Sequence, residues 1–122
     1  MNSQNVVVLG ASPKTDRYSY KAVQQLVEHG HRVLPVNPVC ETICEQQCYK
    51  TLDAISGPVD TLTVYVGADK STELLDEILK LNPRRIIMNP GAENPLLAEK
   101  AQEHHIDVVE GCTLVMLRTQ QF

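Results

Sequence analysis

The chain alternates between short apolar runs and longer stretches in which apolar residues recur at helical spacing. Continuous runs of β-branched and aliphatic residues are typical of strands that are covered on both faces, as in a parallel sheet. Such runs occupy residues 6–9, 32–36, 61–66, 85–88 and 106–109. Helical spacing marks residues 20–29, 69–81 and 95–104, and shorter helices are expected at 51–55 and 113–119.

This alternation predicts an α/β protein with a three-layer, Rossmann-like fold: about five parallel strands with helices on both faces of the sheet. Numbered along the chain, the strands are expected in the order 3-2-1-4-5. A length of 122 residues suits one domain, so residues 1–122 are interpreted as a single unit. The segment 39–58 is the least regular part of the chain.

The loop after the first predicted strand carries the strongest functional signal, because ligands of open parallel sheets bind at the carboxyl ends of the strands, where the strand order reverses. Gly10 lets the backbone turn sharply and approach a ligand. Ser12 offers a hydroxyl, the free N–H groups of the loop and following helix favour an anion, and Lys14 and Arg17 add positive charge. These features predict a phosphate cradle; the alternative is an ordinary strand-to-helix turn, in which Gly and Ser are common.

Two departures from the dinucleotide fingerprint argue against NAD. That fingerprint needs G-x-G-x-x-G and an acidic residue near the end of the second strand. Here Gly10 is the only glycine of the loop, and the second predicted strand ends in Asn37-Pro38. The Walker phosphate loop, G-x-x-x-x-G-K-S/T, is absent from the sequence as well.

Composition narrows the class of partner. The formal charge is −4 and there is no Lys/Arg cluster and no Trp, so a nucleic-acid surface is not indicated. No apolar run approaches the roughly 20 residues that span a bilayer, and residues 1–5 show no secretory n-region. We therefore expect a cytoplasmic protein that does not bind membranes.

Several motifs, in one order, resemble the CoA-binding domain family of small bacterial proteins. The likeness also extends to the CoA-binding domain of the succinyl-CoA synthetase alpha subunit. It runs from about Val6 to Leu117 and rests on residues 8–14, 17–19, 36–38, 48–52, 59–61, 89–94 and 109–117. The resemblance implies a Rossmann-type fold that binds coenzyme A. The synthetase also uses a catalytic histidine, a nucleotide-grasp domain and a partner subunit, so the resemblance implies binding and not catalysis.

The resemblance also implies which residues hold the cofactor. Residues of the first loop would face the phosphates, the residues after the second strand would lie beside them, those after the third would pack near the adenine or pantetheine, and later loops would close the far side. In that order the set is Gly10, Ala11, Ser12, Lys14, Arg17 and Tyr18, then Asn37 and Pro38, then Tyr65 and Val66, then Pro90, Gly91, Glu93 and Cys112.

The cysteines and carboxylates of the chain are candidates for metal, redox or acid–base chemistry. Cys40, Cys44 and Cys48 would share one face if they lay on a helix, but their spacing is not typical of zinc sites, so no metal site is predicted. Cys112 follows the last strand on the ligand side, where it could form a mixed disulfide with the CoA thiol; the alternative is a small buried residue. Glu93 is interpreted as a hydrogen-bonding or capping residue and not as a catalytic acid.

The sequence thus predicts a stand-alone, non-catalytic module that binds coenzyme A or an acyl-CoA in a carrier, sensor or regulatory role. Two alternatives are an NAD(P)-dependent oxidoreductase and an acyl-CoA-handling enzyme that needs a partner subunit. A homodimer or an unknown protein partner is a further possibility.

Overall fold

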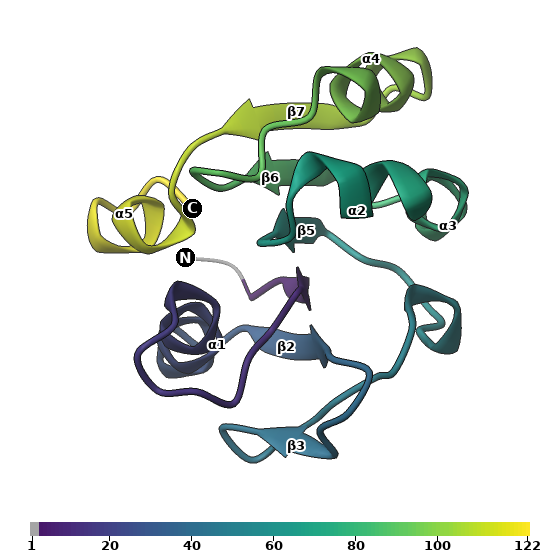
Figure 1. Cartoon of the computed structure of the whole chain (residues 1–122). Coiled ribbons are helices and arrows are strands. Elements are labelled where there is room, and N and C mark those ends of the chain that lie inside the picture. Colours follow the sequence, from purple (N-terminus) through teal and green to yellow (C-terminus); the bar gives the residue numbers. More distant parts are fainter. Residues whose placement is uncertain (1–2) are drawn as a thin grey trace.

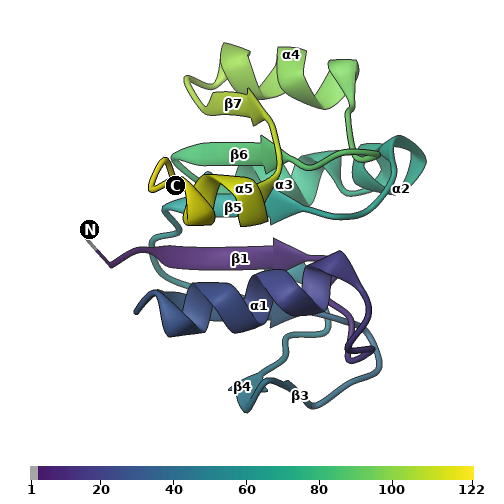
Figure 2. The same ribbon diagram turned by 90° about the vertical axis from the view of Figure 1, so that its left-hand side faces the viewer.

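A computed structural model describes residues 3–122 and contains a five-stranded sheet in which every neighbouring pair of strands is parallel. Figure 2 shows the strand arrows pointing the same way, so their carboxyl ends form one edge. The order across the sheet is β2-β1-β5-β6-β7. The strands are β1 (Asn5–Leu9), β2 (Arg32–Val36), β5 (Thr61–Val64), β6 (Arg85–Met88) and β7 (Asp107–Glu110).

Helices cover both faces of this sheet, which confirms the predicted three-layer α/β class (Figure 1). One face carries α1 (Tyr18–Glu28) and α5 (Thr113–Arg118). The other carries the 3-10 helix η1 (Leu52–Ala54), α2 (Ala68–Glu73), α3 (Leu75–Leu81) and α4 (Pro95–Glu103). Among the described residues, no helix is long and apolar enough to cross a membrane.

Alternate side chains of the strands feed two separate cores, as a doubly covered sheet requires. Val7 and Leu9 point to the face of η1, α3 and α4, where Leu62 and Ile86 join them. Val6 and Val8 point to the face of α1 and α5 and pack with Leu26 and Leu117. All of these side chains are buried.

The predicted strand order was wrong in one respect. We expected residues 61–66 outside the second strand, but β5 lies between β1 and β6, with Val6 opposite Thr61 and Leu9 opposite Val64. All four residues of β5 are buried, which suits a central strand and not an edge. The outer side of β2 is instead met by Tyr49, which pairs with Val36. The strand order still reverses at β1, because β2 lies on one side of it and β5 on the other. The glycine loop after β1 is therefore at the switch point, as expected.

The irregular segment contains a small hairpin of β3 (Thr42–Ile43) and β4 (Gln46–Gln47). Its two-residue turn, Cys44 and Glu45, has positive φ at both positions, as a type I′ turn requires. Cys44 therefore lies in the hairpin turn, and Cys40 and Cys48 lie just outside its two strands, so the shared helical face does not form. Cys48 is buried against the α1 side of the sheet.

Helix boundaries differ from the pattern in one place. The predicted helix over 69–81 is interrupted at Leu74, which ends α2 and begins α3 with φ −96° and ψ 9°. The remaining helices end within one or two residues of the expected positions. The single-domain interpretation remains a prediction, and its first two residues lie outside those described.

Candidate functional site

Gly10 brings the loop after β1 into close contact with the chain after β5. Its φ is +87°, and a Cβ at this position would lie 2.8 Å from Val66 Cγ1 and 3.3 Å from the Tyr65 carbonyl carbon. Only glycine combines the left-handed backbone with this approach. The residue predicted to open the phosphate loop therefore also joins the two strands at the switch point.

Asn37 holds the loops after β1 and β2 together. Its Nδ2 donates to the Ala11 carbonyl oxygen at 2.9 Å, and its Oδ1 accepts from the N–H groups of Val39 and Cys40 at 2.8 and 2.9 Å. The Ala11 N–H in turn donates to the Val36 carbonyl. The amide of Asn37 is thus occupied within the protein, and Pro38 presents the surface that follows β2.

The rest of the first loop, residues 12–17, is largely exposed and carries two cations and one acidic residue, Asp16. Ser12 Oγ accepts from the Lys14 N–H at 3.1 Å, which folds the loop over its own backbone. Lys14, Arg17 and Tyr18 are exposed, and neither cation forms an ion pair with an acidic residue in the described part of the chain. Helix α1 begins after Arg17 without a side-chain cap and without an acidic residue in its first turn. Its N-terminal N–H groups and positive dipole end therefore favour an anion.

A cavity of about 270 Å³ opens beside this loop at the carboxyl edge of the sheet. Three of the predicted residues line it: Gly10, Pro38 and Val66. The rest of the lining comes from the strand ends, the segment before η1 and helices α2 and α3, namely Leu9, Val36, Lys50, Thr51, Leu52, Lys70, Leu74 and Glu77. Its walls are mainly aliphatic and two lysines add positive charge, so it suits part of an anionic organic ligand.

Eleven of the fourteen predicted residues do not line this cavity; besides Ser12, Lys14, Arg17, Tyr18, Asn37 and Tyr65, they are five residues in loops at the same edge. Pro90, Gly91 and Glu93 form the exposed loop after β6, where Glu93 Oε1 accepts from the Gly91 N–H at 3.0 Å. Ala11 is buried in the core under α1. Cys112 is half-buried as the residue before α5. Their contacts with a ligand stay predictions.

Tyr65 and Val66 were expected to share one role, but the strand pleat sends them to opposite faces. Val66 packs on the side of the cavity, whereas Tyr65 packs with the core under α1 and α5. Burial raises the pKa of the Tyr65 phenol to about 12, an effect that the nearby Thr113 and Thr63 hydroxyls partly oppose. The phenol therefore remains protonated near neutral pH.

A buried polar cluster fixes the end of the sheet behind Tyr65. Thr63 Oγ1 lies 2.7 Å from Thr113 Oγ1, and Asn89 Nδ2 donates to Thr63 Oγ1 at 2.7 Å. Asn89 Oδ1 accepts from the Thr113 N–H at 2.9 Å. Because these groups satisfy one another, the cluster locks α5 to β5 and β6 and gives the loops around the cavity a rigid support.

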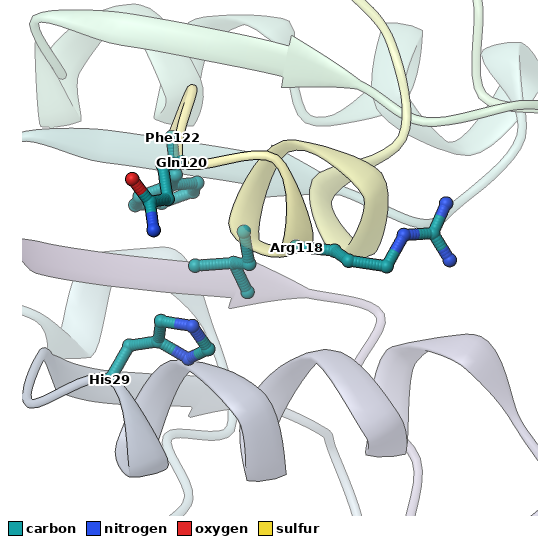
Figure 3. Close-up of a pocket in the computed structure, with 5 residues that line it drawn as sticks. His29, Arg118, Gln120 and Phe122 are labelled. Carbon is teal, nitrogen blue, oxygen red and sulfur yellow. The ribbon is translucent and has the colours of Figure 1, made fainter.

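A larger depression of about 560 Å³ lies at the opposite edge of the molecule. In Figure 3, His29 comes from the end of α1, Gln120 and Phe122 follow α5, and Arg118 extends away from them. Phe122 packs against the buried His31 ring and under the Arg85 guanidinium, both at the amino ends of their strands. This depression is therefore remote from the switch point, and its polar side chains do not converge.

Eight residues of the cavity were not predicted: Leu9, Val36, Lys50, Thr51, Leu52, Lys70, Leu74 and Glu77. Lys50 and Thr51 reach the site because Tyr49 extends the sheet beside β2, donating to the Pro35 carbonyl at 2.8 Å. The position of Lys50 and Thr51 depends on the hairpin that precedes them, and no hydrophobic periodicity in the sequence indicates it. Leu74 and Glu77 are seven and four residues before Leu81 on the helical pattern, so their side toward the sheet could have been inferred, but not their proximity to Gly10.

Comparison with known proteins agrees with this arrangement. A crystal structure of an uncharacterized protein has a TM-score of 0.94 and 38% identity and covers 100% of both chains. The structure of cell-free ID.343 from Thermus thermophilus has a TM-score of 0.89 and 28% identity, covering 98% of this chain and 91% of that one.

Among curated proteins, the chain is 26% identical over 78 residues to the uncharacterized protein YneT of Bacillus subtilis strain 168. The match spans 64% of this chain and 58% of YneT, so it covers less than two thirds of that relative. The family model described as CoA binding domain matches residues 4–118, which is nearly the whole chain and includes every element of the sheet. The chain therefore belongs to the CoA binding domain family.

Proposed function

We propose that this chain binds coenzyme A or an acyl-CoA as a stand-alone, non-catalytic module, with the loop from Gly10 to Lys14 at the phosphates. The observation that carries the proposal is the junction of this loop with the cavity: Gly10 belongs to both. A ligand with phosphates at the loop can therefore place an adjoining organic group between Pro38 and Val66.

Electrostatics support an anionic ligand at this edge although the whole chain carries a charge of −4. Lys14 and Arg17 lie on the loop side, and Lys50 and Lys70 line the cavity. Lys70 is 3.7 Å from Glu73, but this ion pair is exposed and contributes little, so a phosphate can compete for the lysine. Together with the uncapped start of α1, these groups attract phosphate oxygens.

The surroundings of Asn37 support CoA over NAD(P). A dinucleotide site places an acidic side chain after the second strand to accept from the ribose hydroxyls. Here that position holds Asn37, whose Oδ1 already accepts two backbone N–H groups. We also find no described side chain at the cavity with the features of a nucleophile paired to a base, which supports a binding role.

Isothermal titration calorimetry with CoA, acetyl-CoA, NAD and NADP tests the proposal directly. We expect binding of CoA or acetyl-CoA and none of comparable strength for the two dinucleotides. Stabilisation by NAD but not by CoA, measured as a shift in Tm, would contradict it.

The substitution Ser12→Asp tests the position of the phosphates. A carboxylate on the loop should repel them and weaken CoA binding by at least about fivefold, because one unit charge near a phosphate costs roughly 1 to 4 kcal/mol. The matched control is Ser56→Asp, an exposed serine in the connection that leads to the amino end of β5. Equal CoA affinity of the two variants would show that the loop does not contact phosphate.

A further inference from the structure

His31 is a buried titratable residue at the amino edge of the sheet, where it directly precedes β2. The residue is only 6% exposed. Its Nδ1 accepts a hydrogen bond from the Gln4 backbone N–H at 3.0 Å. Nδ1 therefore carries no proton, and the neutral ring holds its proton on Nε2. Nε2 is itself buried without a hydrogen-bond partner among the described residues.

Gln4 is the residue that this hydrogen bond holds, and its other contacts reach across the sheet. Its carbonyl oxygen accepts from the Arg32 N–H at 2.9 Å. Its side-chain Oε1 accepts from Thr61 Oγ1 at 2.7 Å, and Arg85 Nη2 donates to the same Thr61 oxygen at 2.9 Å. Through Gln4, the bond to His31 thus joins the segment before β1 to β2, β5 and β6.

The segment after α5 packs against the same histidine. The ring centroids of Phe122 and His31 lie 5.1 Å apart, and the Arg85 guanidinium carbon lies 4.7 Å from the Phe122 centroid. The neutral imidazole therefore contacts two segments that are far apart in the sequence, one that leads into the first strand and one that follows the last helix.

A second proton on the imidazole would disturb these contacts. It must occupy Nδ1, where it would face the Gln4 N–H and put a donor in place of the acceptor. Both ring N–H groups would then be buried without an acceptor, which costs free energy.

The charges around the ring oppose the proton as well. Burial holds the pKa of His31 below its usual value, and three positive groups act in the same direction: His29 at the end of α1, Arg85 on β6 and the amino terminus of the chain. None of these charges can offset a positive imidazole. Protonation of His31 is therefore opposed both by its hydrogen bond and by its surroundings.

We propose that His31 is a pH-sensitive latch at the amino edge: its neutral ring holds the segments before β1 and after α5, and its protonation in mild acid releases both. None of the latch residues His31, Gln4 and Phe122 lines the cavity at the carboxyl edge, so the latch is independent of the proposed function.

The direction of the pH dependence follows from proton uptake. A histidine in the unfolded chain takes up its proton near pH 6.5, roughly its unperturbed pKa, whereas folded His31 does so at lower pH. The unfolded state therefore binds more protons in this window. The contribution of the latch to stability is complete above about pH 6.5 and is lost as the pH falls from there towards the pKa of the folded protein.

An NMR titration of the full chain from about pH 8 to about pH 5 tests the latch in the wild type. The His31 ring should titrate with a pKa below about 6.5, and the Gln4 amide and the Phe122 ring should shift with the same midpoint. The amide of Val64, at the carboxyl end of the central strand β5, is the control and should not shift with it. A pKa at or above the ordinary value, or a Gln4 amide that does not respond while the ring titrates, would overturn the inference.

Urea unfolding over the same pH range gives a second measurement. His31→Asn removes the titration and keeps a side-chain oxygen that can accept from the Gln4 N–H. Below about pH 6.5 the unfolding equilibrium constant of the wild type should rise by up to about tenfold per pH unit relative to that of His31→Asn, the limit for one proton.

His105→Asn is the matched control, because it removes an exposed histidine after α4 at a positive φ that asparagine tolerates. It should keep the pH dependence of the wild type. Equal pH dependence of the wild type and His31→Asn would overturn the inference. The titration of the wild type decides the question if His31→Asn does not fold. None of these measurements uses CoA, so failure of the proposed function leaves them unaffected.

Discussion

Gly10 has a left-handed backbone and also lies too close to Val66 to carry a side chain. Substitution with alanine tests how much the close contact adds to the strain of the positive φ. Gly10→Ala must place a Cβ in the left-handed region and 2.8 Å from Val66 Cγ1, with the Tyr65 backbone close behind. We expect it to lower the free energy of unfolding by about 2 to 4 kcal/mol. Urea denaturation measures the loss, and calorimetry measures the accompanying loss of CoA affinity.

Gly30→Ala is the matched control for this prediction. Gly30 has nearly the same φ, +85°, but a Cβ there would meet nothing within 4 Å, and the residue ends α1 far from the cavity. Its cost should stay near the backbone term of about 1 kcal/mol, with CoA affinity unchanged. Equal losses of stability in the two variants would mean that the Gly10–Val66 contact adds nothing.

At the scale of elements, Asn94 joins two helices that cover the same face of the sheet. Its Oδ1 accepts from the Leu97 N–H at the start of α4, and its Nδ2 donates to Ser71 Oγ at 2.7 Å and Thr72 Oγ1 at 3.0 Å on α2. Asn94 is buried, so water does not replace these bonds when they are lost.

Asn94→Ala should therefore lower the free energy of unfolding by about 2 to 3 kcal/mol, the sum of a lost cap and of unsatisfied buried groups. Thr72→Ala removes one exposed partner and should cost no more than about 0.5 kcal/mol. Denaturant unfolding followed by circular dichroism measures both. A loss below about 1 kcal/mol for Asn94→Ala would contradict the bridging role of this residue.

Much at this scale could be predicted from the sequence. The apolar runs and helical spacings located the strands and main helices, because each element buries a periodic face. The predicted order of strands, 3-2-1-4-5, was wrong, since the order depends on where the chain goes after Val36. There the hairpin and Tyr49 occupy the outer side of β2, and β5 crosses to the other side of β1. No periodicity encodes that path.

The residues of the candidate site show the same difference between what local pattern predicts and what tertiary packing decides. Gly10, Pro38 and Val66 directly follow strands, so their location at one edge was predictable from topology. Lys50 and Glu77 reach the cavity through the hairpin and through packing of α3, which are tertiary effects. Tyr65 shows why residues after one strand cannot be assigned to the site as a group. A single step along the pleat moves a side chain to the other face of the sheet.

For the whole molecule, the two edges of the sheet have different roles in this interpretation. The carboxyl edge holds the glycine loop with Lys14 and Arg17 and the cavity with Lys50 and Lys70, whereas the amino edge holds the larger depression near His29 and Phe122. At the amino edge, burial of His31 lowers its pKa, so its ring is neutral near pH 7 and does not attract an anion. The depression is larger than the cavity, but topology favours the cavity, because ligands of open parallel sheets bind at the carboxyl ends of the strands.

Hydrogen exchange with and without CoA tests this assignment on the whole chain. Without ligand, amides of the central strands β1 and β5 should exchange most slowly and those of the β3–β4 hairpin much faster, since its strands are two residues long. CoA should slow exchange in residues 10–14, 37–40 and 66–70. Residues 117–122 are the internal control and should be unaffected. Protection of 117–122 without protection of the glycine loop would move the ligand to the amino edge, because bound ligand suppresses opening where it makes contact.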